Sequence, residues 1–421
     1  MQKRILLIGY NFAPEPTGIG KYSGEMMYWL AKQGYDCTVL ASYPFYPQWR
    51  VQEPYRKKRF GYTTEIESFE SGGRLKIVRC PIYVPKSPSG LKRIILDFSF
   101  MLSGGFAIIG RLFKKRYHTV ICVAPPFVLG LLGVIYKWIR QANFVYHIQD
   151  LQIEAARDLG MIRSKSLLNL LLRLERFILK RADTVSSISD GMMNRISEKT
   201  GKPTYFFPNW SDTEKFRPLE NREDLKTKFG FEQNQTIALY SGGIGQKQGL
   251  ENILHAAKAL ERELPKLQFV ICGSGPYRNT LESMKLELKL ENVHFLPLQP
   301  LEVFNEFLNM ADIHLVIQKA GAADLMMPSK LVTILSVGGL ALITANRGSG
   351  LHTLAKNHKV AHATEAENLE ALKSALVEMV DHPDENTLIR KTARAYAEEF
   401  LNMHSVMNRF ACDIVSRRET L

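Results

Sequence analysis

A glycine-rich turn with a neighbouring lysine is the pattern in this chain best suited to chemistry. The strand-like residues 236–241 run directly into Gly242 and Gly243 of a GGIG turn, and an amphipathic helical pattern begins near Leu250. Bare backbone N–H groups at such a turn, together with the positive end of the following helix, bind phosphate. Lys247 follows the turn and adds a charged donor for phosphate oxygens. The spacing predicts a phosphate-binding loop in the second half of the chain.

Two more segments of the second half have the same character. Gly273 and Gly275 follow another strand pattern, where glycine lets the backbone approach a ligand closely. Pro328 and Ser329 precede a helical pattern, and proline near the first turn suits a helix start. Lys330 beside that start predicts a second anion site. Each segment alone is compatible with a structural role, but their shared order and location favour one ligand site.

A third glycine pattern lies near the beginning of the chain. Gly18 and Gly20 belong to a predicted loop over residues 13–24, after the first strand pattern. Open α/β sheets bind ligands at the carboxyl ends of their strands, which is where this loop belongs. The spacing G-x-G-x-x-x-G is not the dinucleotide-binding fingerprint. A plain surface turn before a helix remains the alternative.

His147 ends an apolar strand pattern over residues 143–148, and Asp150 follows three residues later. A histidine at this place is either a hydrogen-bonded core residue or part of a site at the carboxyl edge of the sheet. Its position on the same edge as Gly18 favours the site, with His147 and Asp150 as candidate catalytic residues. A His-x-x-Asp pair is not a metal motif by itself, and no further ligands accompany it, so the sequence predicts no metal site.

The elements that must position these residues alternate between strand and helix, which predicts parallel sheets covered by helices. Strands are expected at 4–8, 37–41, 75–79, 119–123, 143–148, 184–188, 205–207, 236–241, 268–272, 293–295, 313–317 and 341–344. Helices are expected at 25–32, 166–181, 250–263, 277–288, 303–310, 365–380 and 386–416.

The length of 421 residues favours two domains, and a strand-turn-helix unit opens both halves. We therefore expect two similar α/β domains with a cleft between them. The expected bounds are 1–207 for an acceptor-side domain and 208–395 for a donor domain. Residues 396–421 are expected to form a helix that returns to the first domain.

The net charge of +13 suggests attraction to anions, either nucleotide phosphates or an acidic membrane surface, although a generally basic surface gives the same sum. Nucleic-acid binding is disfavoured because zinc-finger spacing and aromatic RNA-binding patterns are absent from the sequence. The odd, scattered cysteines fit buried thiols in the cytoplasm rather than a disulfide framework. The apolar run at the beginning is too short for a signal peptide and predicts a strand.

Residues 94–110 are the membrane candidate of the sequence. They are apolar but include Asp97, and basic residues flank them, with Lys92 before and Lys114 and Lys115 after. The length is marginal for a span, which takes about 20 apolar residues. Two interpretations stay open: a buried helix, or a helix lying on an anionic membrane surface with basic anchors.

Longer stretches resemble a known enzyme family. LAKQGYDCTVLA, PNWSDTEKF and ICGSGPYRNTLE resemble retaining glycosyltransferases of family 4 (GT4), which have the GT-B fold. More narrowly, HIQDLQ, GGIGQKQGLENI, QKAGAAD and PSKLVTILSVGG are similar to the fucosyltransferases of colanic acid biosynthesis. The resemblance covers nearly the whole chain.

The resemblance implies a hexosyltransferase that needs no cofactor. Its donor would be a GDP- or UDP-linked sugar, GDP-fucose among them, and its acceptor a lipid-linked oligosaccharide precursor of an exopolysaccharide. Such an enzyme would be cytoplasmic and peripheral on the inner membrane. Two alternatives of other classes stay open: a sugar-nucleotide epimerase of the GT-B fold, and a non-catalytic nucleotide-sugar-binding protein of an assembly complex.

The family pattern also implies roles for single residues. Gly18 and Gly20 would approach the donor diphosphate or the acceptor, and His147 would polarise and position the donor sugar. Lys247 would meet the phosphates. The helix start at the diphosphate side would be formed by Pro328, Ser329, Lys330 and Leu331.

The chain departs from the family pattern at the donor site. Gly243 stands where the family has arginine, and the family's next lysine aligns better with Gln248 than with Lys247. The usual pair of glutamates is absent, and Leu325 and Thr333 stand in their place. We expect Asp324 or Thr333 to substitute in part at the ribose.

Overall fold

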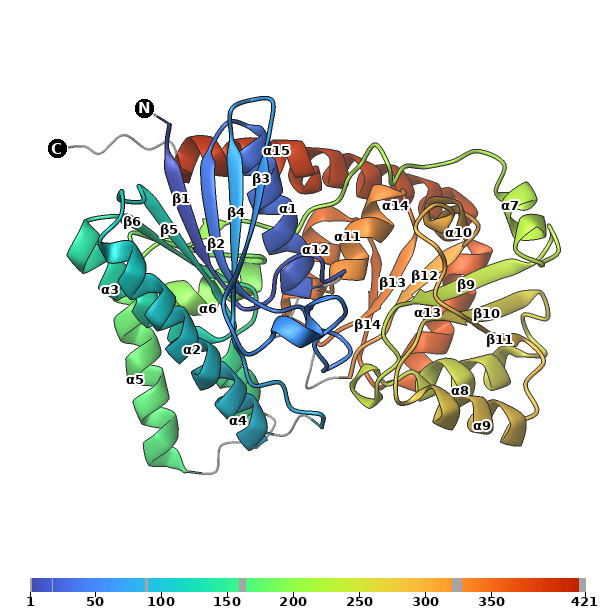
Figure 1. The fold of residues 1–421 in the computed structure, drawn as a ribbon. Coiled ribbons are helices and arrows are strands. Elements are labelled where there is room, and N and C mark those ends of the chain that lie inside the picture. Colours follow the sequence, from blue (N-terminus) through green and yellow to red (C-terminus); the bar gives the residue numbers. More distant parts are fainter. Residues whose placement is uncertain (1, 17, 88–89, 159–163, 320–327, 416–421) are drawn as a thin grey trace. The chain divides into compact units, whose positions relative to one another are not determined.

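The structure is a computed structural model that describes residues 2–16, 18–87, 90–158, 164–319 and 328–415, with all their side chains except those at 155 and 247. Its contacts divide the chain into two compact units, each an α/β structure (Figure 1). The first unit comprises Met1–Phe207 and Met407–Leu421, and the second comprises Pro208–Val406. Two α/β domains were predicted from the sequence, and this fold class is confirmed.

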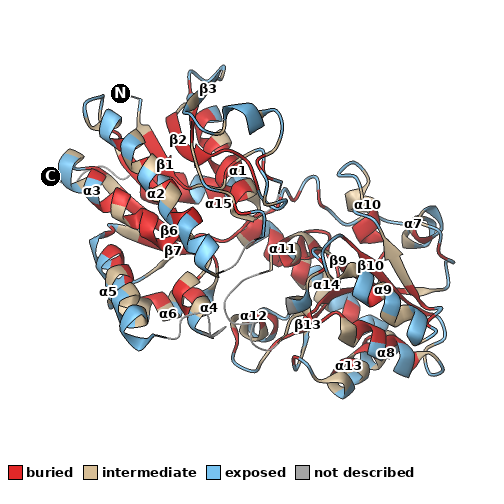
Figure 2. Cartoon of the chain, turned by 60° about the horizontal axis from the view of Figure 1, so that its bottom comes forward, coloured by how far each residue is buried: buried red, intermediate tan, exposed pale blue. Residues whose placement is uncertain are grey.

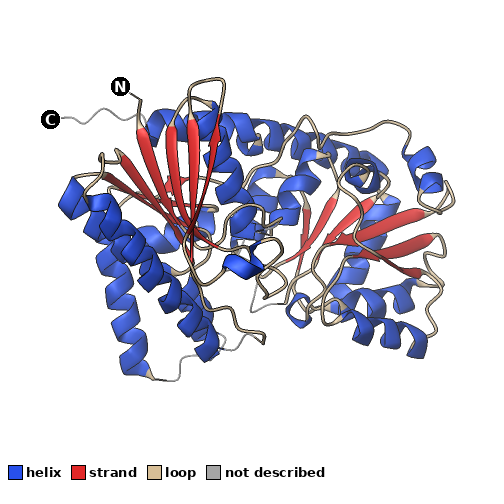
Figure 3. Cartoon of the chain, viewed as in Figure 1, coloured by secondary structure: helices blue, strands red, loops and turns tan. Residues whose placement is uncertain are grey.

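The first unit is built on an eight-stranded sheet of order β3-β4-β2-β1-β5-β6-β7-β8 (Figure 3). Its strands are β1 (Arg4–Ile8), β2 (Asp36–Ser42), β3 (Thr63–Ser68), β4 (Arg74–Cys80), β5 (Thr119–Ala124), β6 (Asn143–Ile148), β7 (Thr184–Ser187) and β8 (Tyr205–Phe206). All neighbours pair in parallel except β3 and β4, which are antiparallel. Every residue of β2 and β5 is buried, as expected for central strands covered on both faces.

Within the described residues, six helices connect these strands. They are α1 (Gly18–Lys32), α2 (Gly90–Leu112), α3 (Gly130–Arg140), α4 (Gln152–Asp158), α5 (Lys165–Arg181) and α6 (Asp190–Thr200), with short 3-10 turns η1 (Tyr55–Lys58) and η2 (Phe127–Leu129). Serine caps begin two of them: the hydroxyl of Ser164 accepts from Leu167 N in α5, and that of Ser189 accepts from Met192 N in α6. Gly201 ends α6 with φ of 68°, a conformation that glycine adopts without strain.

The second unit has a six-stranded parallel sheet of order β11-β10-β9-β12-β13-β14. Its strands are β9 (Thr236–Ser241), β10 (Leu267–Cys272), β11 (Val293–Leu296), β12 (Ile313–Val316), β13 (Ala341–Thr344) and β14 (His362–Thr364). Its helices are α7 (Arg222–Lys228), α8 (Glu251–Leu260), α9 (Arg278–Glu287), α10 (Phe304–Asn309), α11 (Ser329–Ser336), α12 (Gly350–His358), α13 (Leu369–Asp381) and α14 (Pro383–Tyr396). In both units the buried residues concentrate in the strands and on the inner sides of the helices (Figure 2).

The single long helix predicted over 386–416 is wrong. After α14 and a π-turn at Ala397–Leu401, Asn402 takes an extended conformation with ψ of 126°, and a separate helix, α15 (Met403–Phe410), follows. The break has a polar cause, because the Asn402 amide donates to Thr213 Oγ1 at 2.6 Å and Ser211 N donates to Leu401 O at 2.8 Å. These contacts replace the hydrogen bonds of a continuous helix.

The end of the described chain packs within the first unit. The Phe410 ring stacks on Phe207 with centroids 4.1 Å apart, and the Tyr205 hydroxyl bonds to Asp413 at 3.0 Å. The Asn143 amide donates to Ile414 O at 3.2 Å. Residues 407–415 therefore pack against the first sheet at its β8 side.

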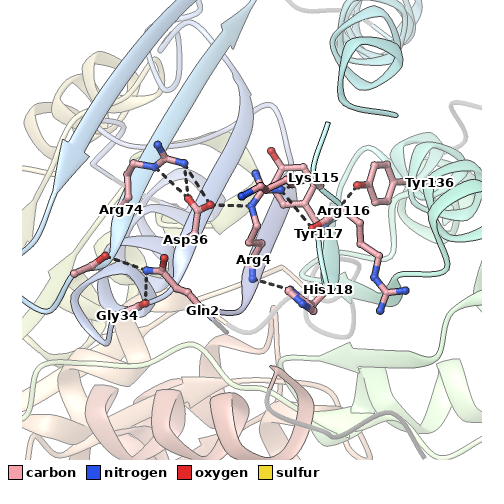
Figure 4. Close-up of polar contacts among 11 residues, drawn as sticks. Gln2, Arg4, Gly34, Asp36, Arg74, Lys115, Arg116, Tyr117, His118 and Tyr136 are labelled. Atoms are coloured by element: carbon pink, nitrogen blue, oxygen red, sulfur yellow. Dashed lines mark hydrogen bonds and ion pairs between the residues drawn. The ribbon is translucent and has the colours of Figure 1, made fainter. Parts of the chain in front are cut away.

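Polar contacts hold the amino edge of the first sheet together (Figure 4). Asp36, at the start of β2, accepts from Arg4 Nε at 2.8 Å and pairs with Arg74 at 3.1 Å. Arg4 N donates to His118 Nδ1 at 2.9 Å, and the Arg4 side chain also bonds to the Lys115 carbonyl. The charged groups of this edge pair with one another, whereas open α/β sheets bind ligands at the opposite, carboxyl edge.

Most predicted strands are confirmed, and two were missed. β3 is an edge strand whose side chains are mostly exposed, so it has little hydrophobic pattern, and β14 has only three residues. The first helix was predicted at 25–32 but begins at Gly18, so the loop predicted over 13–24 is shorter than expected. Small residues cause the difference, because Gly20 and Gly24 let the helix pack closely on Glu15 and Ala13.

Candidate functional site

Two glycine loops of the second unit are joined by backbone hydrogen bonds at the carboxyl edge of its sheet. They follow β9 and β10, which pair directly. Gly242 N donates to Cys272 O at 2.9 Å, and Ile244 N donates to Ser274 O at 2.9 Å. Since β9 also pairs with β12, the first loop lies where the strand order reverses, the place at which open α/β sheets bind ligands.

The glycines of the two loops differ in the space that surrounds their Cα atoms. Gly273 and Gly275 have φ of 154° and 159°, and a Cβ at either would collide with the first loop, at the carbonyl of Gly242 or of Ile244. They are needed for the two loops to approach each other. Gly243 is different, because a Cβ there would meet no atom within 4 Å. Of the two glycine loops, it is the turn at Gly243 that has open space for a ligand.

Lys330 reaches the first glycine loop from α11. Its Nζ lies 3.5 Å from the centroid of the Tyr240 ring, and a Cβ on Gly242 would come within 3.0 Å of it. The Tyr240 hydroxyl donates to Gly243 O at 2.7 Å, so one tyrosine positions both the lysine and the loop. Desolvation lowers the pKa of Lys330 to about 7. No described carboxylate forms an ion pair with Lys330, which leaves its charge available to an anion.

The other residues predicted near this lysine differ in position. Ser329 is the first residue of α11 and is exposed, and Pro328 is its N-cap, as the helix start required. Thr333 is half-buried on the same helix. Leu331 is fully buried and packs with the hydrophobic core of the sheet. Asp324 and Leu325 lie outside the described residues.

Lys247 lies in a 3-10 turn, η3 (Gln246–Gln248), between the first glycine loop and α8. The neighbouring Gln248 turns its side-chain oxygen toward the loop, and a Cβ on Gly245 would come within 2.8 Å of it. Lys247 and Gln248 thus belong to the connection from the first glycine loop to α8. The described contacts of Lys330 bring its ammonium to Gly242.

In the first unit, a buried glutamate holds the loop after β1. Glu15 accepts from Phe45 N at 3.0 Å, from Tyr46 N at 2.9 Å and from the Asn11 amide at 2.8 Å. Its burial raises the pKa of the carboxyl group. Gly20 lies directly against this carboxylate, whereas Gly18 has no atom within 4 Å of a would-be Cβ and a φ of 60°. Gly20 therefore permits packing, and Gly18 leaves the carboxyl edge open.

His147 is an interior residue at the end of β6. It is 3% exposed, its Nδ1 lies 3.0 Å from Ser186 Oγ, and its ring meets Phe207 edge-on at 5.1 Å. Burial lowers its pKa to about 3, so the imidazole is neutral at physiological pH. Asp150 is half-buried in the bend that follows. Among the described residues, no group of three His, Cys, Asp or Glu is arranged to hold a metal ion.

A second buried carboxylate, Asp97, bridges three elements of the same edge. It lies on α2 and accepts from the Gln152 amide at 2.8 Å and from the Tyr10 hydroxyl. Gln152 in turn accepts from Phe127 N at 3.0 Å. Burial raises the pKa of Asp97 to about 6. The chain ends of β1, β5 and β6 are thereby tied to α2.

The helix that bears Asp97 lies on the surface of its unit. Its buried positions form one stripe, at Leu96, Asp97, Phe100, Gly104 and Ile108. Seven other large apolar side chains of α2 are exposed: Leu91, Ile94, Ile95, Phe98, Leu102, Phe106 and Ile109. Within the described chain, α2 is the helix that has the length and composition to cross a membrane. The interpretation of residues 94–110 as an ordinary buried helix is wrong, because only one face is covered.

Sequence reasoning missed Tyr240, Glu15 and Tyr10, and treated Asp97 only as an argument against a membrane span. Tyr240 sits inside an apolar strand pattern and gives no local signal. Glu15 stands between two prolines next to the glycine pattern, and Asp97 is the acid within an apolar stretch. An acid in such a place is costly unless bonded, which is the signal that could have found both.

Comparison with known proteins places the whole chain in one family. Residues 221–396 match the family described as "Glycosyl transferases group 1", and residues 17–210 match the "Glycosyl transferase 4-like domain". WcaI of Escherichia coli K12 is 38% identical over 98% of this chain and 99% of its own. A GDP-mannose-dependent phosphatidylinositol monomannoside mannosyltransferase of Mycolicibacterium smegmatis is 22% identical over 99% of both chains.

Solved structures agree in fold. Sucrose-phosphate synthase from Thermosynechococcus elongatus matches 98% of both chains with a TM-score of 0.75 and 15% identity. HepE from Anabaena, in complex with UDP-glucose, covers 98% of this chain and all of its own, with a TM-score of 0.68 and 13% identity. The two α/β units, the glycine loops at the switch point of the second sheet and the full-length relative lead to one conclusion: the chain is a glycosyltransferase of the GT-B fold and belongs to the group 1 family.

Proposed function

We propose that this enzyme is a retaining glycosyltransferase that moves a sugar from a nucleoside diphosphate donor to a lipid-linked exopolysaccharide precursor at the cytoplasmic membrane surface. GDP-fucose is the first donor to test. The observation that carries the proposal is the contact of Lys330 with the first glycine loop, next to the open space at Gly243. An ammonium beside an open glycine turn is suited to hold a diphosphate.

The chemistry asks the protein to stabilise negative charge. As the bond from sugar to phosphate breaks, charge grows on the leaving diphosphate, and donors already in place stabilise it without reorganisation. Lys330 has a depressed pKa in the free protein, and a neighbouring dianion raises it again. Lys330 is then charged when the donor is bound. In retention with a front-side approach, the departing phosphate oxygen takes the proton of the acceptor hydroxyl, so no side-chain base is assigned.

The relatives support the choice of substrates. The name of the Escherichia coli relative assigns it provisionally to colanic acid biosynthesis as a glycosyl transferase. The mycobacterial relative uses GDP-mannose and a phosphatidylinositol mannoside. A GDP-linked donor and a membrane-bound acceptor are therefore the combination that we propose first. The epimerase and the non-catalytic assembly protein receive no separate support from the described residues.

The surface of the first unit supports a membrane location. The exposed apolar face of α2 continues onto α3, which contacts both α2 and α5. There Trp138 and Ile139 are 55% and 56% exposed, and on α5 Leu170 is 61% exposed. Basic side chains border this face, among them Lys92, Arg93, Lys114 and Lys115, and Arg181 lies over the Trp138 ring at 5.6 Å. Apolar area ringed by cations fits an anionic bilayer surface.

The donor can be identified by thermal shift with GDP- and UDP-linked sugars. The right donor should raise the melting temperature of the wild-type protein but have a much smaller effect on Lys330→Met. Lys266→Met is the matched control, because Lys266 is exposed and precedes β10, at the other edge of the same sheet. An equal response of both variants would refute the assignment of Lys330 to the diphosphate.

A further inference from the structure

The first unit contains a basic pocket that lies outside the sites described above. Its volume is about 610 Å³, and its walls come from three segments: residues 48–51, residues 56–60 and residues 82–86. Among the described residues that line it are four cations, Arg50, Arg56, Arg59 and Lys86, and no acidic side chain. Like charges around a hollow repel one another, and an anion bound inside the pocket would reduce this electrostatic repulsion.

The described carboxylates do not neutralise the cations of the pocket. No described carboxylate pairs with Arg50, Arg56, Arg59 or Lys86. The Arg59 guanidinium donates to Arg56 O at 3.0 Å and lies 4.4 Å from the centroid of the Phe60 ring. Elsewhere in this unit, by contrast, basic residues form ion pairs, as Arg79 does with Glu65 at 3.0 Å. A guanidinium presents several donors in a fixed plane, which matches the oxygens of a phosphate or a diphosphate.

Aromatic side chains form the remaining wall of the pocket. Phe60 is 80% exposed and Tyr83 is 43% exposed, and both line the hollow. Trp49 lines it too, with the Arg93 guanidinium 5.2 Å from its ring. Exposed aromatic rings next to cations suit a ligand that joins an anionic group to an apolar chain or to the face of a sugar ring.

The pocket is anchored to the apolar helix α2. Ser99, on α2, accepts from Tyr83 N at 2.9 Å, and Ser103 Oγ donates to Pro81 O at 2.6 Å. The Tyr62 hydroxyl donates to Ser103 O at 2.8 Å. The pocket walls on both sides are therefore fixed along the helix whose exposed apolar face we assign to the membrane. A ligand with its apolar chain in the bilayer could place its charged group in this hollow.

We infer that this pocket binds the diphosphate group that links a prenyl lipid to the acceptor saccharide. The inference rests on the proposed function, since it supplies the anchoring site for the lipid-linked acceptor. A diphosphate matches the number of unpaired cations better than a monophosphate does. The isoprenoid chain would leave along Phe60 and Tyr83 toward α2. The site belongs to the first unit alone and is distinct from the donor loops of the second.

The test uses farnesyl diphosphate as a short, soluble probe in titration calorimetry with the full-length protein. Arg56→Gln/Arg59→Gln removes two lining cations. Lys57→Gln/Lys58→Gln is the matched control, because these exposed lysines lie in the same segment, carry the same charge and do not line the pocket. The arginine pair should weaken binding by about tenfold or more, because charge-assisted bonds are lost. The lysine pair should stay within about twofold, as surface charges do.

Several results would overturn the inference. An equal loss in both double variants would mean diffuse attraction by positive charge, and unchanged binding in the arginine pair would place the probe elsewhere. Farnesyl monophosphate binding as tightly as the diphosphate would refute the choice of group. The thermal shift with nucleotide sugars is measured on the same proteins. A thermal shift with a nucleotide sugar but no binding of farnesyl diphosphate would support the proposed function and refute the pocket assignment. Binding of farnesyl diphosphate without any nucleotide-sugar response would support the pocket assignment and contradict the proposed function. Loss of the donor response in the arginine pair would assign the pocket to the donor instead.

Discussion

The ammonium of Lys330 lies 3.5 Å from the centre of the Tyr240 ring, and the hydroxyl of the same tyrosine holds the carbonyl of Gly243. A cation on an aromatic face is attracted to the ring, yet removal from water lowers the pKa of this lysine to about 7. The lysine is therefore poised between charged and neutral states. An anion that binds next to Gly242 should favour the charged state of Lys330.

Diphosphate binding should take up a proton. Above pH 7 a growing fraction of Lys330 is neutral in the free protein, and a bound dianion raises its pKa, so the complex holds more protons than its parts. Calorimetry of GDP or UDP binding at pH 8, in buffers of different ionisation enthalpy, measures this uptake. Lys330→Met should abolish the uptake and weaken binding by about tenfold to a hundredfold. Binding without proton uptake in the wild-type protein would contradict this account of Lys330.

Two glycines of the loop pair should differ in their response to alanine. Gly275→Ala forces a Cβ against Ile244 O in a backbone conformation with φ of 159°, and should destabilise the protein by about 1–3 kcal/mol. Gly243→Ala adds a methyl group to open space and should leave stability unchanged. Thermal denaturation of the two variants measures the difference. If Gly243→Ala proves the more destabilising, the assignment of packing and open positions is wrong.

Asp97 should make the protein less stable as pH rises from about 4 to about 6. Its folded-state pKa of about 6 lies above the ordinary value of 3.8, so the unfolded chain loses this proton first and unfolding becomes easier over that range. Asp97→Asn removes the effect. Its stability relative to the wild-type protein should improve by up to about 3 kcal/mol between pH 4 and pH 7. Urea unfolding at several pH values measures this, and a difference that does not change with pH would refute it.

Membrane binding should depend on α2. Leu102 and Phe106 are 65% and 68% exposed on its outer face, and replacing both with serine removes apolar area without touching the buried stripe. Co-sedimentation with phosphatidylglycerol vesicles should drop sharply. Leu286→Ser/Leu298→Ser is the matched control, since these residues are 76% and 63% exposed on the second unit.

The charge around the same face should matter as well. Binding should fall as salt rises, and fall further when Lys114 and Lys115 are neutralised, because each basic residue near an anionic surface contributes about 1 kcal/mol. Equal binding to neutral and anionic vesicles would contradict the role given to these lysines. Extraction from membranes by detergent but never by salt would instead indicate that α2 spans the bilayer.

His147→Ala tests the two interpretations of the buried histidine. We expect a strong loss of turnover with the melting temperature nearly kept, as the prediction from the sequence requires. Ser186→Ala, which removes only the partner at 3.0 Å from Nδ1, should have a smaller effect on turnover. A large loss of stability with normal turnover of the surviving protein would make His147 a structural residue.

The alternation of strands and helices could be predicted because buried parallel strands are continuous apolar runs. β1, β6, β9 and β13 have the predicted bounds, and the glycine loops follow the predicted strands. The start of α1 could not be predicted, because Gly18 and Gly20 are poor helix formers, and their place in the helix depends on contacts with Glu15. The local sequence pattern does not reveal such contacts, so it does not predict where α1 begins.

The candidate site also has features that the sequence predicts and features that only the fold creates. Lys330 could be singled out because Pro328 and Ser329, just before it, are typical of a helix start. Its proximity to Tyr240 could not, since a tyrosine within an apolar strand is ordinary core composition. The basic pocket also escaped detection, because its cations come from three segments that the fold brings together along α2.

The most direct test is to incubate the purified protein with labelled GDP-fucose and other GDP- and UDP-linked sugars, together with a lipid extract that contains prenyl-linked saccharides. The account predicts that label from one donor moves into the organic phase, that nucleoside diphosphate is released in equal amount, and that chelator does not prevent it. Label that stays on the nucleotide as an isomerised sugar would make the protein an epimerase. A donor that binds and stays intact in the presence of the acceptor would make it a non-catalytic nucleotide-sugar-binding protein.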